Sequence, residues 1–157
     1  MSGTAQKSCR GSAGFSIVEV LTGIGLMAVV SLVAVPNARE FTDRYQLMSA
    51  ASQLSFEIAR ARMQAIGQNA FVRIRLLDSG DYIRERSSDN VTFVQDDVTK
   101  TLPSGITATA GDSGTPSFDR NGIAAVATSI TLQNPRGSKT VQTNILGRVT
   151  ISSVGTG

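Results

Sequence analysis

Residues 15–35 read FSIVEVLTGIGLMAVVSLVAV, an apolar stretch whose single charged side chain belongs to Glu19. An α-helix of this length measures about 31 Å, which matches the hydrocarbon core of a bilayer at about 30 Å. The apolar part of a secretory signal is shorter, about 7–15 residues, and does not hold a carboxylate near its start. We therefore interpret residues 15–36 as a membrane-spanning helix and not as a secretory signal.

The charges on the two sides of this stretch differ and predict its orientation. Lys7 and Arg10 precede the stretch without an acidic neighbour. The flank after Pro36 is neutral, with Arg39, Glu40, Asp43 and Arg44. Because basic flanks stay on the cytoplasmic side of a membrane, we expect the amino end in the cytoplasm and everything after Pro36 outside it.

The helical pattern continues beyond the apolar stretch, over residues 37–66. Apolar side chains recur there at spacings of four and three, at Leu47, Ala51, Leu54, Ile58, Ala61 and Ala65. Polar side chains repeat on another side, at Gln46, Ser49, Gln53, Glu57, Arg60 and Gln64. This spacing predicts an amphipathic helix that ends near Gly67. We expect one long helix from Phe15 to Ile66, whose second half needs a cover for its apolar stripe.

From residue 67 onward the sequence shows short alternating runs separated by turn signals. The predicted strands are residues 70–77, 81–86, 91–95, 106–110, 129–133, 140–143 and 148–152. Turns are predicted at residues 78–80, 103–105, 121–122 and 135–137, which are rich in Gly, Pro, Asn and Ser. We therefore predict an α+β fold. In it, helix 37–66 and an antiparallel β domain over 67–157 form a single unit, residues 37–157.

The composition excludes several kinds of enzyme. The chain has no His, so a Ser-His-Asp or Cys-His catalytic group and the commonest metal ligand are missing. Its one Cys, Cys9, cannot form an internal disulfide or a thiolate metal site. The net charge is +3, from 15 basic and 12 acidic residues, which is weak evidence for nucleic-acid binding. We predict a non-enzymatic protein with no catalytic residues, no metal and no cofactor.

The amino end resembles the type IV prepilin class. The resemblance lies in residues 14–21, GFSIVEVL, followed by the apolar helix and Pro36. It implies a leader peptide over residues 1–14, which a prepilin peptidase removes between Gly14 and Phe15 before it N-methylates Phe15. It also implies a type IV pilin-like fold, with one long helix packed on an antiparallel sheet. Glu19 and Pro36 take the positions that the family uses in assembly.

Glu19 needs an explanation in its own right, because a carboxylate inside a membrane costs about 2.5–3.5 kcal/mol at mid-membrane on insertion scales. Lys7 and Arg10 leave with the predicted leader. Cleavage creates a new cation, the amine of Phe15, and methylation keeps its charge. Glu19 can therefore pair with the amine of its own chain or of a neighbouring subunit, and the resemblance favours the neighbour.

Later segments resemble one subgroup, the H-type minor pseudopilins and related minor pilins. They are residues 43–51, 58–62, 118–122 and 146–151. The resemblance implies a structural subunit of a type II secretion pseudopilus or a type IV pilus, located in the bacterial inner membrane with a periplasmic domain before assembly. The implied partners are the prepilin peptidase, other pilins or pseudopilins, and an inner-membrane assembly platform with a cytoplasmic ATPase.

A DNA-binding minor pilin for natural transformation is the alternative within this class. Some relatives carry a basic Gly-Arg-x-Arg motif near the carboxyl end. Here the corresponding Gly147-Arg148-Val149-Thr150 lacks the second Arg, which lowers this alternative.

Four arginines form one further candidate site, for an anion or a neighbouring subunit. A two-residue hairpin loop at residues 79–80 would place Arg75 opposite Arg84 and Arg73 opposite Arg86. Like charges directly opposite each other on a sheet are destabilising, so the cluster predicts an acidic partner. Three kinds of partner fit this requirement: DNA phosphates, carboxylates of a neighbouring subunit, or the local acids Asp89, Asp96 and Asp97.

Overall fold

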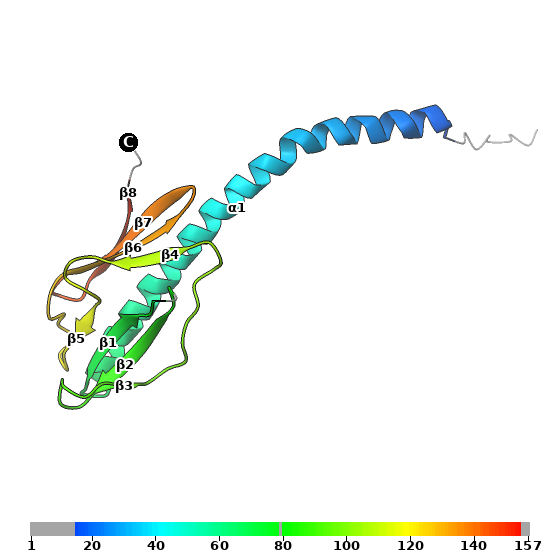
Figure 1. The fold of residues 1–157 in the computed structure, drawn as a ribbon. Helices are drawn as coiled ribbons and strands as arrows, with labels where there is room; N and C mark the ends of the chain where they lie inside the picture. The colour runs from blue at the N-terminus through cyan, green and yellow to red at the C-terminus, as the bar shows by residue number, and fades with distance from the viewer. Residues whose placement is uncertain (1–14, 79, 155–157) are drawn as a thin grey trace, which may run out of the picture. The chain divides into compact units, whose positions relative to one another are not determined.

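The computed structural model describes residues 15–78 and 80–154, and gives no side-chain environment for residues 33–39. Two compact units divide the chain, one up to Arg39 and the other from Glu40 onward. The predicted leader, residues 1–14, lies outside the described residues. Helix α1 (Ile17–Gly67) contributes to both units, and all strands belong to the second (Figure 1).

The ends of α1 agree with the predicted helix to within two residues. At its start, the carbonyl oxygen of Ser16 accepts hydrogen bonds from the backbone N–H groups of Glu19 (3.0 Å) and Val20 (3.2 Å). At its end, the Ala70 N–H donates to the Ala65 carbonyl at 3.1 Å, and Asn69 has φ +51°. This is the Schellman arrangement, in which a left-handed residue, here Asn69, stops the helix.

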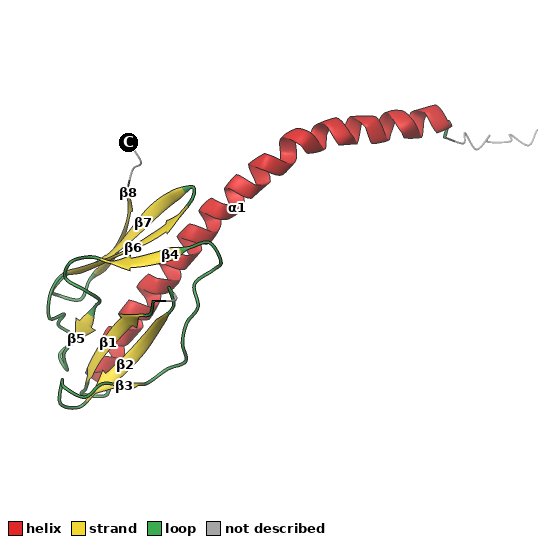
Figure 2. Cartoon of the chain, in the orientation of Figure 1, coloured by secondary structure: helices red, strands yellow, loops and turns green. Residues whose placement is uncertain are grey.

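Two four-stranded sheets complete the second unit (Figure 2). The first sheet has the order β3-β2-β1-β5, with β1 (Phe71–Leu76), β2 (Tyr82–Ser87), β3 (Val94–Gln95) and β5 (Ser117–Phe118). The second has the order β4-β6-β7-β8, with β4 (Thr107–Ala110), β6 (Thr128–Asn134), β7 (Gly137–Thr143) and β8 (Val149–Val154). All neighbouring strands are antiparallel, as predicted. The short strand β5 was not predicted, and the predicted strand 91–95 is reduced to β3.

The predicted apolar stripe of α1 forms the centre of the core. Leu47 is 4% exposed, and the other five predicted positions are fully buried. Both sheets contribute to the same cluster, the first through Val72 and Ile74 and the second through Ile130 and Leu132. The stripe is therefore covered by the strands, which confirms the α+β arrangement.

Three hairpin loops share one geometry that sets the strand registers. In the first, Gly80 N–H donates to the Leu77 carbonyl (2.9 Å) and Leu77 N–H donates to the Asp81 carbonyl (2.8 Å). The same pair of bonds closes the loops that contain Gly122 and Gly147. All three glycines have positive φ, between +74° and +85°. This is the hairpin in which a turn is followed by one left-handed residue, a conformation that favours glycine.

A chain that starts at Arg39 is expected to be soluble and monomeric and to unfold cooperatively. Leu47, Leu54 and Ile58 are buried against strands of the same compact unit, so the apolar segment before Arg39 is not needed for their cover. Thermal unfolding followed by circular dichroism, with sedimentation for the mass, measures both properties. A broad transition without cooperativity would show that the domain depends on the preceding helix.

Candidate functional site

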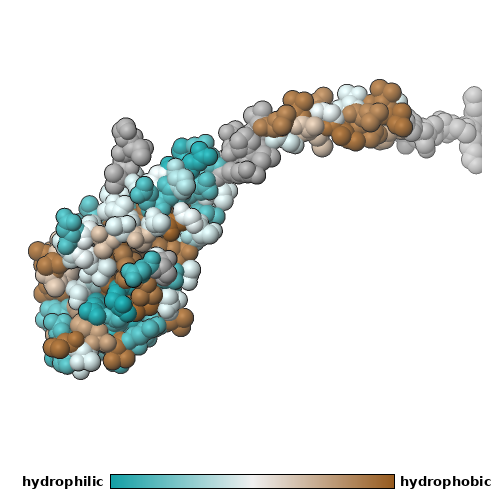
Figure 3. Space-filling view, viewed as in Figure 1, coloured by the Kyte–Doolittle hydropathy of each residue, from teal (hydrophilic) through white to brown (hydrophobic). Residues whose placement is uncertain are grey.

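The first half of α1 presents its apolar side chains to the surroundings. Phe15 is 83% exposed. Ten large apolar residues between positions 17 and 32 are 50–78% exposed, namely Ile17, Val18, Val20, Leu21, Ile24, Leu26, Met27, Val29, Val30 and Leu32. Figure 3 shows this segment as a mainly hydrophobic surface. Exposed apolar surface of this extent is typical of a site that contacts protein or lipid.

Glu19 lies in the first turn of α1, and its side chain is exposed. A negative charge at this end of a helix interacts favourably with the partial positive charge of the free N–H groups. Gly14, on the other side of the predicted cleavage point, lies outside the described residues. Pro36 has helical backbone, but its side-chain environment is not described. The roles of Gly14, Phe15, Glu19 and Pro36 therefore remain predictions.

Among the described residues, no helix meets both the length and the hydropathy required of a membrane span. The membrane-spanning role of residues 15–36 stays a prediction.

The predicted register of the arginine hairpin is wrong by one residue. Strands β1 and β2 pair Arg73 with Glu85, Ile74 with Arg84, and Arg75 with Ile83. The loop closes at Leu77 and Asp81 instead of at residues 78 and 81. A shift of one residue in the pairing of two strands changes which of their side chains share a face of the sheet. The four arginines thus form two groups, one on each face of the first sheet.

Arg73 and Arg75 share one carboxylate, that of Glu85. The Nε atoms of the two arginines lie 2.6 and 2.8 Å from its two oxygens, and the Glu85 side chain is 7% exposed. Burial alone raises the pKa of Glu85, but the hydrogen bonds and charges of the two arginines outweigh it and hold this pKa below its usual value. Arg73 also lies over the ring of Phe93, 3.9 Å from its centre.

Arg84 is the centre of the second group and is buried, with ion-pair partners on α1 and in the segment after β3. Its guanidinium lies 3.2 Å from a carboxylate oxygen of Glu57 and 2.7 Å from one of Asp97. Glu57 is also buried, at 7% exposure. Burial, together with the negative charge of Glu57, raises the pKa of the neighbouring Tyr82 to about 12. Charged groups buried this deeply occur in proteins when they are paired.

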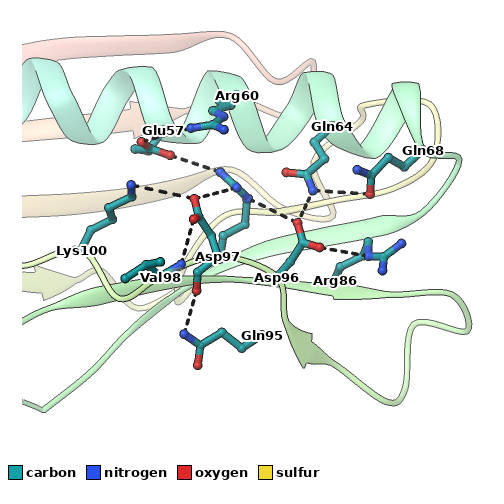
Figure 4. Close-up of polar contacts among 11 residues, drawn as sticks. Glu57, Arg60, Gln64, Gln68, Arg86, Gln95, Asp96, Asp97, Val98 and Lys100 are labelled. Carbon is teal, nitrogen blue, oxygen red and sulfur yellow. Dashed lines mark hydrogen bonds and ion pairs between the residues drawn. The ribbon is translucent and has the colours of Figure 1, made fainter.

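Arg86 takes a more exposed place beside the same cluster. Its Nε lies 3.3 Å from one carboxylate oxygen of Asp96, and the other oxygen of Asp96 accepts a hydrogen bond from the Gln64 amide (Figure 4). Asp89 was considered as a partner for the arginines, but its carboxylate binds the Ser87 hydroxyl and the backbone N–H groups of Val91 and Thr92. Local acids therefore contact all four arginines.

The two most buried acids of this region, Glu57 and Glu85, were not predicted as site residues. Glu57 was placed on the polar side of the helix, and Glu85 was not considered. Glu85 lies between Arg84 and Arg86 in the sequence, and neighbouring residues of a strand point to opposite faces of the sheet. With the correct register, this alternation would have placed Glu85 on the face of Arg73 and Arg75. The described residues contain no group of three His, Cys, Asp or Glu side chains that could hold a metal ion. Chemically, the arrangement is a set of ion pairs. The pair of Arg84 with Glu57 joins the first sheet to α1, and the pairs of Glu85 lie within that sheet.

Most of the chain matches one family of known proteins. The family model described as type II transport protein GspH matches residues 50–154. The type IV minor pilin FimU of Pseudomonas aeruginosa is similar in structure, with a TM-score of 0.54 and 19% identity over 71% of this chain and 92% of FimU. The minor pseudopilin EpsH of the Vibrio cholerae type 2 secretion system gives a TM-score of 0.58 and 10% identity, over 69% and 97%. No curated protein sequence gives a significant match.

Proposed function

Since this chain belongs to the GspH family of type II transport proteins, we propose that it is a structural minor pilin or minor pseudopilin that assembles through the first half of α1. The observation that carries this proposal is the set of ten large apolar side chains between residues 17 and 32 that are 50–78% exposed. Such a helix requires a partner of low polarity. A bilayer supplies one before assembly, and the helices of other subunits supply one in a filament.

The proposal assigns separate roles to the two units of the chain. The helix up to residue 36 anchors the protein in the bacterial inner membrane with its amino end in the cytoplasm, and the unit after it is periplasmic. The prepilin peptidase cleaves between Gly14 and Phe15, and a platform driven by a cytoplasmic ATPase brings the protein together with other pilins. The role is structural and needs no catalytic residue or cofactor.

The amino terminus of the mature protein tests this proposal directly. We expect the membrane-extracted protein to begin with N-methylated Phe15, because the polar, basic residues 1–14 meet the apolar helix at this point. Intact mass and terminal sequencing measure the cleavage and the methyl group. A different first residue, or an unprocessed chain in cells that contain the peptidase, would contradict the proposal.

The DNA-binding alternative gains no support from the arginines, because local carboxylates contact all four of them. We expect the domain after Arg39 to bind duplex DNA no more tightly than the non-specific range of about 10⁻⁴–10⁻⁶ M near physiological salt. Gel-shift titration at two salt concentrations measures this, with the three arginines that reach the surface, Arg73, Arg75 and Arg86, changed to Gln for comparison. Sub-micromolar binding that these changes abolish would make DNA uptake the leading function.

A further inference from the structure

The outer face of the second sheet carries no charged side chain at its strand positions. Ile130 and Val141 are buried in the core, so their neighbours in β6 and β7 point to the other face, and the registers of β4 and β8 extend these rows across the sheet. Apart from Val154 at the edge, every strand position on this face is Ser, Thr or Gln. We call these residues the hydroxyl face. They are Thr107, Thr109, Ser129, Thr131, Gln133, Ser138, Thr140, Gln142, Thr150 and Ser152.

The hydroxyl face is free to meet a ligand, because the sheet packs on the core through its other face. Most of its side chains are exposed, and at its centre the hydroxyls of Thr131 and Thr140 lie 3.1 Å apart and share a hydrogen bond. Hydroxyl and carboxamide groups both donate and accept hydrogen bonds. The face therefore offers donors and acceptors without a net charge.

One end of the hydroxyl face is hollowed. The open hollow has a volume of about 670 Å³, within the ~300–1,000 Å³ of small-ligand sites. Gln142 and Thr150 of the face line it, together with residues of two loops. Asp112 comes from the loop after β4 and Arg148 from the loop before β8, and β6 and β7 lie between these strands in the sheet. The hollow thus has an acidic residue on one side and a basic residue on the other.

Backbone contacts hold both walls of the hollow in place. The Gly111 N–H donates to the Ser129 carbonyl at 2.7 Å, and the Gly114 N–H donates to the Gly111 carbonyl at 2.8 Å. A Cβ atom at Gly111 would clash with the Ser129 side chain, so glycine alone allows this close approach. On the other side, the Asn144 carboxamide oxygen accepts a hydrogen bond from the Arg148 backbone N–H at 2.8 Å. Walls formed in advance lower the cost of ordering a site when a ligand binds.

The two charged residues of the hollow are not neutralised by neighbours. Within the part of the chain that the structure describes, no ion pair joins Asp112 or Arg148 to another residue. An anionic ligand would meet the carboxylate of Asp112, and a cationic ligand would meet the guanidinium of Arg148. A neutral ligand that donates to the carboxylate and accepts from the guanidinium suits both.

We propose that the hollow and the hydroxyl face bind a neutral, polyhydroxylated chain, that is, an uncharged glycan. Each sugar hydroxyl donates and accepts hydrogen bonds, which matches the Ser, Thr and Gln side chains of the face. Peptides are commonly recognised through pockets for apolar side chains, and the hydroxyl face has none. The hollow seats a short segment of the glycan, and the rows beyond it continue the same chemistry. This inference concerns the second unit alone and goes beyond the proposed function, so cleavage before Phe15 does not bear on it.

Saturation-transfer NMR with the full chain in detergent micelles tests the proposal. The probes are two neutral tetrasaccharides, cellotetraose and the β-1,4-linked tetramer of N-acetylglucosamine. We expect saturation transfer to at least one of them with a Kd of about 1 mM, which is weak because the face has no aromatic ring on which a sugar could stack. No transfer to either probe at about 10 mM, tenfold above this Kd, would overturn the inference. Equal binding of a Gly-Ser peptide of similar length, or tighter binding of a sulfated tetrasaccharide, would also overturn it.

Two exposed glutamines of the same face give a matched pair of variants. Gln142 lines the hollow, and Gln133 lies at the other end of the face. Gln142→Ala is expected to weaken binding of the tetrasaccharide about threefold to tenfold, as the loss of a hydrogen bond does, while Gln133→Ala leaves it unchanged. Thr150→Val, which removes a hydroxyl from the hollow and keeps the branched shape, should weaken it by a similar factor.

All three side chains are exposed, so the variants should keep the unfolding transition of the unmodified protein, which circular dichroism checks. If Gln142→Ala binds like the unmodified protein, or if Gln133→Ala weakens binding as much as Gln142→Ala does, the glycan does not occupy the hollow and the inference fails.

Discussion

Replacement of Arg84 by Ala is expected to lower the free energy of unfolding by about 3–5 kcal/mol. Arg84 is 6% exposed and lies 3.2 Å from Glu57 and 2.7 Å from Asp97. Removal of one member of a buried ion pair leaves the other charge without compensation in a poorly hydrated place, and this cost exceeds the value of the pair itself. Urea unfolding of the domain that starts at Arg39 measures the change.

Two further variants show whether burial causes the effect. Arg86 lies two residues along the same strand with a side chain 51% exposed, so Arg86→Ala should cost only about 0–1 kcal/mol. The double variant Arg84→Met/Glu57→Leu removes both buried charges and should recover most of the loss, because apolar residues of similar size often replace a buried pair without cost. A loss below about 1 kcal/mol for Arg84→Ala would show that solvent reaches the pair.

Acid titration gives a second readout of the same cluster. The backbone N–H of Val98 and the charge of Arg84 hold the pKa of Asp97 below its ordinary value of 3.8. A carboxyl whose pKa is lower in the folded protein stabilises the fold above its ordinary pKa, and this stability is lost as the pH falls toward the folded pKa. Without the charge of Arg84, the pKa of Asp97 is lowered less. The Arg84→Ala variant should therefore lose less stability than the unmodified domain when the pH falls from 6 to 3.

Local pattern was sufficient to predict the helix and most strands. The stripe from Leu47 to Ala65 has the helical period, and all six of its predicted positions are buried. The strands from β6 to β8 were found within about three residues, because turn residues separate them. Strand β5 has only two residues and pairs with β1, more than forty positions earlier in the chain, so no local pattern identifies it.

The arginine site could not be predicted from local pattern, because it depends on a loop length and on two distant pairings. Gly80 takes the left-handed position of a longer loop, which shifts the register by one residue and separates the arginines. Glu57 and Arg84 meet only after α1 packs on the first sheet, and their spacing of 27 residues carries no periodic signal.

Glu19→Gln is expected to leave cleavage and membrane insertion intact but to lower co-purification with sibling pilins about tenfold or more. Loss of the charge should ease insertion by up to about 3 kcal/mol on insertion scales. In the assembled filament, however, it would leave the amine of a neighbouring Phe15 without its carboxylate. Truncation of one partner of a buried charge pair costs about 2–5 kcal/mol, and each 1.4 kcal/mol corresponds to a factor of ten.

A matched control separates this loss from a general weakening of the helix. Thr22 lies three residues further along α1 and is exposed, and its hydroxyl donates to the Val18 carbonyl of the same helix at 2.7 Å. Thr22→Val should therefore keep both insertion and co-purification. Glu19→Ala should behave like Glu19→Gln, because both substitutions remove the charge. Gln keeps a side chain of the same size and Ala does not, so equal behaviour would assign the effect to the charge. If Glu19→Gln co-purifies as well as Thr22→Val does, the carboxylate has no part in assembly, and the exposed apolar surface of residues 17–32 alone holds the subunit in the filament.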